Sequence, residues 1–169
     1  RAICMGYLHQ PDKTAAEFCE GYWKSGDFGR IDANGFLYVL DRVKDTIIHK
    51  GKNVYPSAVE SALCAHPAVQ MAAVVGIDDA SVGEAVHAEI VLREGLTLNV
   101  KDLRTFLVGK IPRHNVPRTI KVASSIPLSP VGKVLRRVVR DACHLPVAAP
   151  LPVKKSVSVK RTTGKPDAT

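Results

Sequence analysis

The chain has 169 residues and a formal net charge of +8 at pH 7. This length suits one ordinary domain or a small domain with extensions. No apolar run approaches the ~18 residues that span a bilayer, and no apolar segment precedes a small-residue cleavage site, so neither a membrane span nor a signal peptide is predicted. Because the chain begins at Arg1 and continues directly into apolar residues, we expect it to be a piece of a longer protein.

The first forty residues predict short elements separated by glycines. Residues 11–20 indicate a short helix, because a proline suits its first turn. The pair Asn34-Gly35 predicts a tight turn between two strands, the second of which runs to Leu40.

The stretch DRVKDTIIHKGKNVYP, residues 41–56, surrounds the short apolar pair Ile47-Ile48 with charges. The pair is too short for a helix, and the charges do not suit a buried strand. The stretch therefore predicts a strand–turn–strand edge that handles an anionic ligand or changes position. The helix predicted next covers residues 56–64, which begin with proline and carry apolar residues at helical spacing.

Three further strands are predicted from apolar patterning. Residues 69–77 are almost continuously apolar, which indicates a strand buried on both faces. Residues 86–92 alternate and suit a neighbouring strand, and residues 119–123 predict a third. We expect these segments to form a three-stranded sheet.

Two helices and a loop complete the unit. Asn99 is placed to cap a helix that ends at Gly109, and two prolines and a glycine predict a loop at 127–133. An amphipathic helix follows at 134–143, with its arginines, Arg136 among them, expected on the exposed face. The order of elements predicts an α+β unit in which helices cover a three-stranded sheet, plus a β-hairpin.

Composition divides the chain into three parts. Residues 1–40 are expected to belong to a preceding domain, and residues 41–144 to form the α+β unit. Residues 145–169 contain five basic residues, one acidic residue, four prolines and no aromatic residue. Such a segment buries too little apolar surface to fold, so it predicts a disordered basic tail.

The cysteines and histidines predict no metal site. The four cysteines form no C-x-x-C pair, and the six histidines form no H-x-H or H-x-x-x-H pair, which argues against a zinc site or a redox dithiol. Scattered cysteines fit a reducing compartment. With no signal peptide and no terminal Ser-Lys-Leu, the expected localisation is cytoplasmic.

Three glycine-marked segments could bind an anionic ligand. In Ser25-Gly26-Asp27, a carboxylate on an exposed turn suits a vicinal diol such as ribose. In residues 41–56, an arginine suits phosphate or ribose oxygens, and a glycine between lysines lets the backbone approach a ligand. In Pro130-Val131-Gly132-Lys133, a restricted loop can present a lysine to a phosphate. Each segment alone also fits an ordinary solvated turn.

Taken in order, these segments closely resemble the C-terminal part of AMP-forming acyl-CoA synthetases, the adenylate-forming superfamily. YWKSGDFGRIDANGFLYVLDR is similar to the family segment W-[FYK]-x-[TS]-G-D-x-G-x-x-D-x-x-G, and LSPVGKVLRR is similar to its terminal G-K-[VI]-x-R. The resemblance covers residues 1–144. It departs at Asp41, where the family often has Gly, and at Ala58, where it commonly has Glu.

The resemblance implies a small C-terminal lid domain, preceded by the β-rich end of a larger N-terminal domain. It implies that Asp27 holds the ribose hydroxyls of ATP and that Arg42 contacts the nucleotide near the ribose. Lys133 falls on the catalytic lysine that bridges the substrate carboxylate and the α-phosphate.

The resemblance also implies residues for domain movement and for the thiol. Lys44 and Asp45 fall on the hinge about which the lid domain changes pose between two half-reactions. Lys50 and Gly51 fall on the loop that borders the pantetheine channel of CoA.

The implied reaction uses ATP, CoA and Mg²⁺, and forms an acyl-adenylate and then an acyl-CoA thioester. A fatty acid is the favoured acid, on the basis of the DRVKD segment. The family's phosphate-gripping loop and acyl pocket belong to its N-terminal domain. We therefore expect these residues alone to bind no cofactor tightly and to be inactive without the missing N-terminal domain.

Other readings stay open. An aryl acid:CoA ligase or a domain that loads a carrier protein fits the same motifs, and so does luciferase-like oxidation of the adenylate. From another class, a non-catalytic basic module could bind nucleic acid or a membrane surface, given the +8 charge. Against it, aromatic residues make up only 5% of the chain and no nucleic-acid-binding motif is found.

Overall fold

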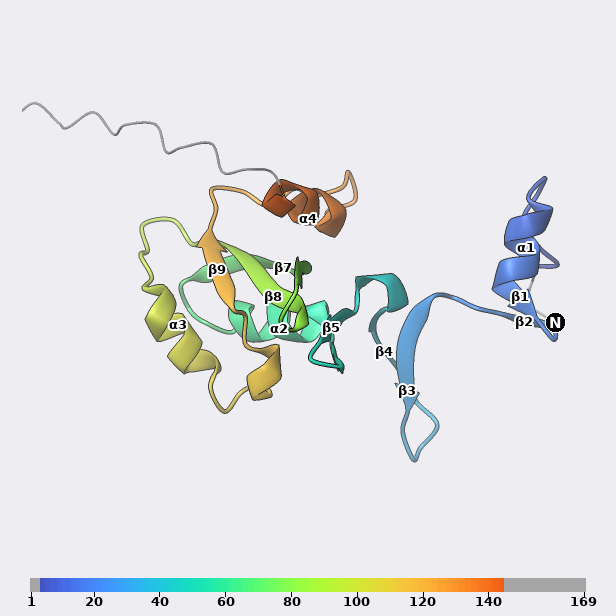
Figure 1. Cartoon of the computed structure of the whole chain (residues 1–169), viewed down its shortest axis with the longest axis horizontal. Helices are drawn as coiled ribbons and strands as arrows, with labels where there is room; N and C mark the ends of the chain where they lie inside the picture. The colour runs from blue at the N-terminus through green and yellow to red at the C-terminus, as the bar shows by residue number, and fades with distance from the viewer. Residues whose placement is uncertain (1–3, 145–169) are drawn as a thin grey trace, which may run out of the picture.

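The computed structural model describes residues 4–144 of the chain (Figure 1). The tail predicted at residues 145–169 lies outside the described residues. None of the helices within residues 4–144 has the length and apolar content needed to cross a bilayer.

The described part of the chain contains four α-helices, two short 3₁₀ helices and nine strands. The helices are α1 (Pro11–Glu17), η1 (Val43–Asp45), α2 (Pro56–Cys64), α3 (Val100–Leu107), η2 (Arg113–Asn115) and α4 (Arg136–His144). The strands are β1 (Phe18–Cys19), β2 (Tyr22–Trp23), β3 (Asp27–Ile31), β4 (Leu37–Arg42), β5 (Ile47–His49), β6 (Lys52–Val54), β7 (Val69–Asp79), β8 (Gly83–Leu92) and β9 (Thr119–Val122).

The central sheet has five strands, in the order β6-β5-β8-β7, and β9 pairs in parallel with β8. The predicted mixture of helices and a sheet is confirmed, with one refinement. The hairpin β5–β6 is not separate from the three other strands, because His49 pairs with Gly83 at the start of β8. The hairpin therefore extends the same sheet.

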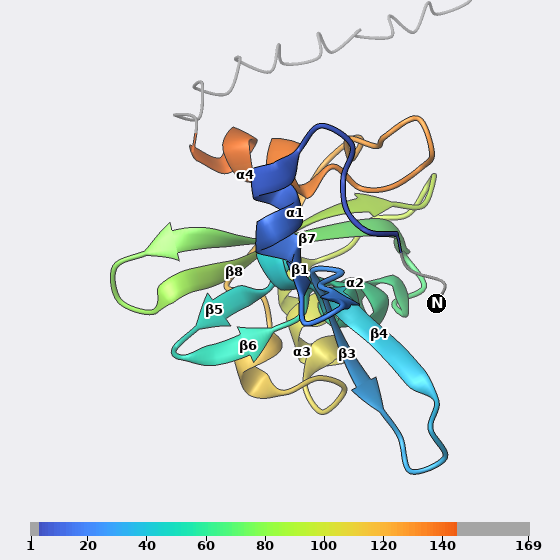
Figure 2. The same cartoon turned by 90° about the vertical axis from the view of Figure 1, so that its right-hand side faces the viewer.

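The sheet is covered on both faces, as the continuous apolar pattern of β7 predicts. Ala72 and Val74 face a core formed with α2 and α3, which includes the fully buried Leu63 and Leu103. The alternate residues of β7 face a second core, in which Val139 of α4 is 1% exposed. Figures 1 and 2 both show α3 and α4 on opposite sides of the sheet. Since α4 follows directly after residues 127–135, its packing anchors the loop that carries Lys133.

Asp41 ties strand β4 to helix α2. The residue is 8% exposed, and its carboxylate accepts hydrogen bonds from the Arg42 and Ser57 amides, both at 2.8 Å. The residue before α2, Tyr55, offers no capping side chain. Asp41 therefore satisfies a free amide of the first helical turn and places a negative charge at the positive end of the helix. This gives a structural reason for an aspartate at this position.

Residues 4–40 form no core of their own. None of them is buried, and the β3–β4 hairpin exposes Phe36 by 65%, Leu37 by 66% and Val39 by 65%. Its turn is the predicted one: the Asp32 carboxylate accepts the amides of the turn, and Gly35 has φ of 85°. Figure 1 shows α1, β1 and β2 well apart from the five-stranded sheet.

Candidate functional site

Lys133 is presented by a tight, hydrogen-bonded turn. Ser129 accepts the Gly132 amide at 2.8 Å, with Pro130 at the second position of the turn, which is the residue order that a type I turn favours. Gly132 has φ of 77°, a left-handed conformation that glycine adopts without strain. The Ser129 hydroxyl also accepts the Lys133 amide, and Leu128 pairs with Val134. The backbone of Lys133 is thus fixed while its side chain is exposed.

The Lys133 side chain borders a depression of about 380 Å³, which also contacts Arg42, Asp45, Glu60 and Arg136. The Lys133 ammonium forms no ion pair with any residue of the described range 4–144. A cation that no internal carboxylate neutralises is available to an anionic ligand in this depression.

Arg136 connects the elements around the depression through its carboxylate partners. Its guanidinium donates to Glu60 at 2.7 Å and lies 3.5 Å from Asp45 and 3.9 Å from Asp41. Burial lowers the pKa of Arg136, but the Glu60 hydrogen bond and the three carboxylate charges outweigh it, so the pKa lies above its ordinary value. Arg136 therefore stays charged and joins α4 to α2, η1 and β4.

The prediction that Arg136 is exposed is wrong. Its side chain is only 19% exposed, while the adjacent Arg137 is exposed. Burial of this arginine is possible because three carboxylates from earlier elements meet it, and no pattern within α4 itself indicates them.

The structure brings Asp27 and Arg42 together. They are cross-strand partners at the base of β3 and β4, and the Asp27 carboxylate lies 3.8 Å from Arg42 Nε. Arg42 lies between two depressions: the one beside Lys133 and one of about 490 Å³ that Gly26 and Lys44 also line. The predicted nucleotide-binding pair is thus adjacent to the Lys133 depression.

Lys44 and Asp45 lie in η1, which connects β4 with the five-stranded sheet. Lys44 is exposed, whereas Asp45 is half-buried beside Arg136. The Val43 amide donates to the Gly26 carbonyl at 2.8 Å, so η1 begins against the glycine turn that precedes Asp27. The predicted hinge residues therefore lie between the two parts that a hinge would connect.

Lys50 and Gly51 form the two-residue turn of the β5–β6 hairpin. Their φ angles are 51° and 71°, both positive, as in the turns that match the twist of such hairpins. The Lys50 amide donates to the Val82 carbonyl at 2.8 Å, which fixes the turn against the β7–β8 loop.

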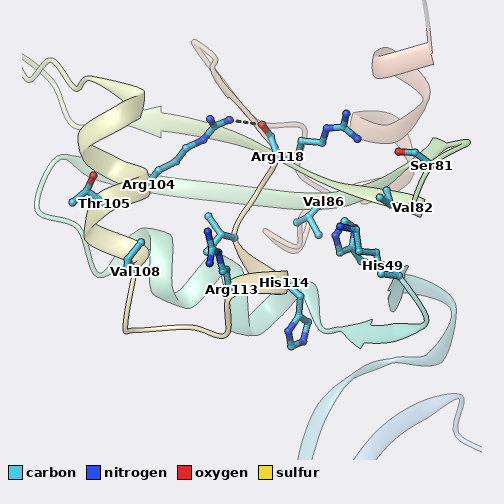
Figure 3. A pocket seen from close by; sticks show the side chains of 12 residues that line it. His49, Ser81, Val82, Val86, Arg104, Thr105, Val108, Arg113, His114 and Arg118 are labelled. Carbon is cyan, nitrogen blue, oxygen red and sulfur yellow. Dashed lines mark hydrogen bonds between the residues drawn. The ribbon is translucent and has the colours of Figure 1, made fainter.

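Lys50 borders a third depression, of about 590 Å³, which sequence analysis missed (Figure 3). Its lining is rich in basic side chains from α3, from η2 and from the residue before β9: Arg104, Arg113, His114 and Arg118, with His49 from β5. Of these, Arg118 is paired with Asp79. The basic residues come from four separate segments of the chain, so no linear motif could have indicated this cleft.

The predicted site residues fall into two groups. Asp27, Arg42, Asp45 and Lys133 lie in one connected region, whereas Lys50 borders the basic cleft. The lining of the basic cleft shares no residue with that of the Lys133 depression. Sequence analysis did not predict that Glu60 and Arg136 contribute to this region, although Arg136 is the last residue of the G-K-[VI]-x-R motif. The chain thus presents two separate cationic surfaces, each suited to an anionic ligand.

Comparisons with known proteins indicate the family of the chain. Residues 58–133 match the family model for the AMP-binding enzyme C-terminal domain. A fatty acid–[acyl-carrier-protein] ligase, ScoC, from Streptomyces coeruleorubidus is 42% identical over 140 residues, which cover 83% of this chain and 27% of the relative. A 2-succinylbenzoate–CoA ligase from a Geobacillus strain is 38% identical over 139 residues, 82% of this chain and 28% of the relative.

A solved structure shows the same fold. The amide bond synthetase McbA from Marinactinospora thermotolerans superposes with a TM-score of 0.75 at 38% identity, covering 81% of this chain and 28% of McbA. The chain spans about a quarter of the length of the curated relatives it matches. It belongs to the adenylate-forming, AMP-binding enzyme family and contains the C-terminal domain of that family.

Proposed function

We propose that the protein to which this chain belongs is an ATP-dependent acid:CoA ligase, in which this C-terminal domain serves both half-reactions. In the first, a carboxylate oxygen attacks the α-phosphorus of ATP, an acyl-adenylate forms and pyrophosphate leaves. In the second, the CoA sulfur attacks the acyl carbon, a thioester forms, AMP leaves and the thiol proton is released.

The observation that carries the proposal is the exposed ammonium of Lys133 on a rigid turn, which forms no ion pair within residues 4–144. Adenylation brings a carboxylate and a phosphate together, so negative charge accumulates in the transition state. A fixed cation at that point stabilises the transition state more than the separated reactants. The neighbouring Asp27 and Arg42 are proposed to hold the ribose of the same nucleotide.

The second half-reaction is proposed to use the other cationic surface. Lys50 of the Lys50-Gly51 turn lines the basic cleft, whose cationic side chains suit the phosphates of CoA. Gly51, the next residue, is proposed to let the turn backbone come close to the narrow pantetheine arm. Because the two surfaces share no lining residue, one domain must turn to offer each in succession. Lys44 and Asp45 of η1 are proposed to be the hinge.

The exposed apolar residues of the β3–β4 hairpin are evidence that a larger domain packs against this surface. A run of large apolar side chains at this exposure is typical of a surface that another domain covers. We propose that residues 1–40 belong to the large adenylating domain and residues 41–144 to the moving domain. Because that domain is proposed to supply the phosphate loop and acyl pocket, the 169-residue chain alone is proposed to be inactive.

A fatty acid is the proposed substrate, in keeping with the fatty acid named for the ScoC relative. The relatives' names also include an aryl acid, a carrier protein and an amide bond, so an aryl acid or a carrier protein are the alternatives. Mg²⁺ is proposed to arrive with ATP as part of the substrate, because Asp45 and Glu60, the carboxylates beside Lys133, are engaged by Arg136. The four cysteines are free, which fits the proposed cytoplasmic setting.

The test is product formation by the full-length parent protein. Incubation with Mg²⁺-ATP, CoA and a panel of fatty and aryl acids is expected to yield AMP, pyrophosphate and an acyl-CoA, with the highest rate for a fatty acid. The 169-residue chain under the same conditions is expected to release no pyrophosphate. Parent protein that releases no acid-dependent pyrophosphate contradicts the proposed function, and turnover by the short chain contradicts its proposed inactivity.

A further inference from the structure

The α4-covered face of the sheet holds a cluster that the ligase reaction does not use. His87 and Glu89 are two residues apart on β8 and therefore point to the same face. Both lie in the layer beneath α4, opposite Val75 and Ala73 of the second core. A ring nitrogen of His87, a carboxylate oxygen of Glu89 and the Cys143 sulfur lie within 4.8 Å of one another.

His87 has an unused nitrogen in a buried position. The residue is 7% exposed, and its Nε2 has no hydrogen-bond partner among residues 4–144. Its Nδ1 lies 2.6 Å from the Thr119 hydroxyl, which leaves Nε2 as the nitrogen available to a ligand. A metal-binding histidine typically has its other nitrogen held in this way.

Glu89 and Cys143 supply two further ligand types. Glu89 is 6% exposed, and one of its oxygens accepts from Lys121 at 2.7 Å, which leaves the other oxygen free of Lys121. Cys143 lies near the end of α4, is partly buried and has a free thiol. A cation among the three groups would offset the negative charges of both the carboxylate and a thiolate.

We propose that His87, Glu89 and Cys143 bind a borderline-soft divalent cation of the Zn²⁺ class. The mixed nitrogen, oxygen and sulfur set is one that Zn²⁺ accepts, and three protein ligands leave a fourth position for water. On binding, the Cys143 thiol releases its proton to solvent and the sulfur forms the metal bond. Because Cys143 belongs to α4 and the other two ligands to β8, the ion fixes the end of α4 to the sheet. The proposal does not depend on the ligase function.

The test is titration of the 169-residue chain with Co²⁺, which reports a thiolate ligand through a charge-transfer absorption band. We expect the band to saturate at one Co²⁺ per chain and to be displaced by Zn²⁺. Cys143→Ser is expected to abolish the band. The matched control, Cys64→Ser, changes an exposed cysteine of α2 and is expected to leave the band intact.

Two further variants test the proposal even if Cys143→Ser fails to fold. Both change exposed residues that contact the proposed ligands His87 and Glu89. Thr119→Val removes the hydroxyl that holds His87 and is expected to weaken Co²⁺ binding roughly tenfold or more. Lys121→Met removes the competing cation on Glu89 and is expected to tighten binding. The proposal is overturned if no band forms at saturating Co²⁺, if the band survives Cys143→Ser, or if the Thr119 and Lys121 variants bind Co²⁺ as the unaltered chain does.

Discussion

Arg136 shows how a single residue can organise the candidate site. Three carboxylates from β4, η1 and α2 meet its guanidinium. Lys133, three residues earlier, has no such partner in the part of the chain that the structure describes. One cation of the motif is therefore structural, whereas the other is available to a ligand. We regard Arg136 as a positioning residue, which acts on the reaction through the loop before α4.

Arg136→Ala is expected to lower the free energy of unfolding by about 3 kcal/mol, because it leaves Glu60 and Asp41 with reduced compensation in a largely buried setting. The measurement is urea unfolding followed by circular dichroism. Arg137→Ala, one residue along the same helix and exposed, is the matched control and should change the stability by less than about 0.5 kcal/mol. Equal effects of the two changes would show that the ion cluster contributes nothing specific.

At the scale of elements, the sequence indicated nearly every helix and strand of residues 41–144. The patterns that did so are local: the proline that begins α2, the Asn99 cap that accepts the Lys101 amide at 2.9 Å, and the apolar run of β7. The pairing of β5 with β8 was not indicated, because a single pair, His49 with Gly83, joins segments more than thirty residues apart. The sequence analysis also predicted no metal site, whereas one is proposed on β8 and α4. Spacing within a motif indicates only ligands that are close in the sequence, and these ligands come from distant elements.

The proposed hinge role of η1 predicts which half-reaction a change in this element will slow. Lys44→Pro disfavours the helical conformation of Val43, the residue before the new proline, and should disrupt η1. In the full-length parent we expect slower thioester formation with adenylate formation largely retained, measured in separate single-turnover assays.

Lys44→Ala is the control, because it removes the charge of Lys44 and leaves the backbone free. We expect it to retain most of the second step. If the proline variant has unaltered kinetics in both steps, η1 is not the pivot.

The turn between β7 and β8 predicts a response to acid. The Ser81 hydroxyl and amide, with Arg118 nearby, hold the pKa of Asp79 below its ordinary value of 3.8. The stabilisation that this carboxylate gives is therefore complete above that value and is lost as the pH falls through the folded-state pKa. Ser81→Ala should raise the pKa of Asp79, as followed by carboxyl-carbon NMR, and Ser124→Ala, at an exposed serine, should leave it unchanged. A pKa of Asp79 that is already ordinary in the unaltered chain would refute this account of the turn.

At the scale of the whole molecule, the order of several weak motifs carried more information than any one of them. Ser25-Gly26-Asp27 and Pro130 to Lys133 each suit a plain turn. The fold shows a bend at Gly26 directly before β3, and a hydrogen-bonded turn at residues 129–132. They line two different depressions that share Arg42, and this arrangement is a tertiary property that the sequence indicated only through family resemblance. The basic cleft beside Lys50 could not be foreseen, because its arginines come from separate elements and have no common spacing.

The measurement that tests the central claim most directly is a comparison of the two half-reactions in the full-length parent carrying Lys133→Ala. If Lys133 stabilises the adenylation transition state, acid-dependent pyrophosphate release should fall by roughly 10²–10³-fold. Thioester formation from a supplied acyl-adenylate and CoA should stay close to that of the unaltered protein. Lys101→Ala, at an exposed lysine of α3, should affect neither step. Equal loss in both half-reactions, or unaltered pyrophosphate release, would contradict the role assigned to Lys133.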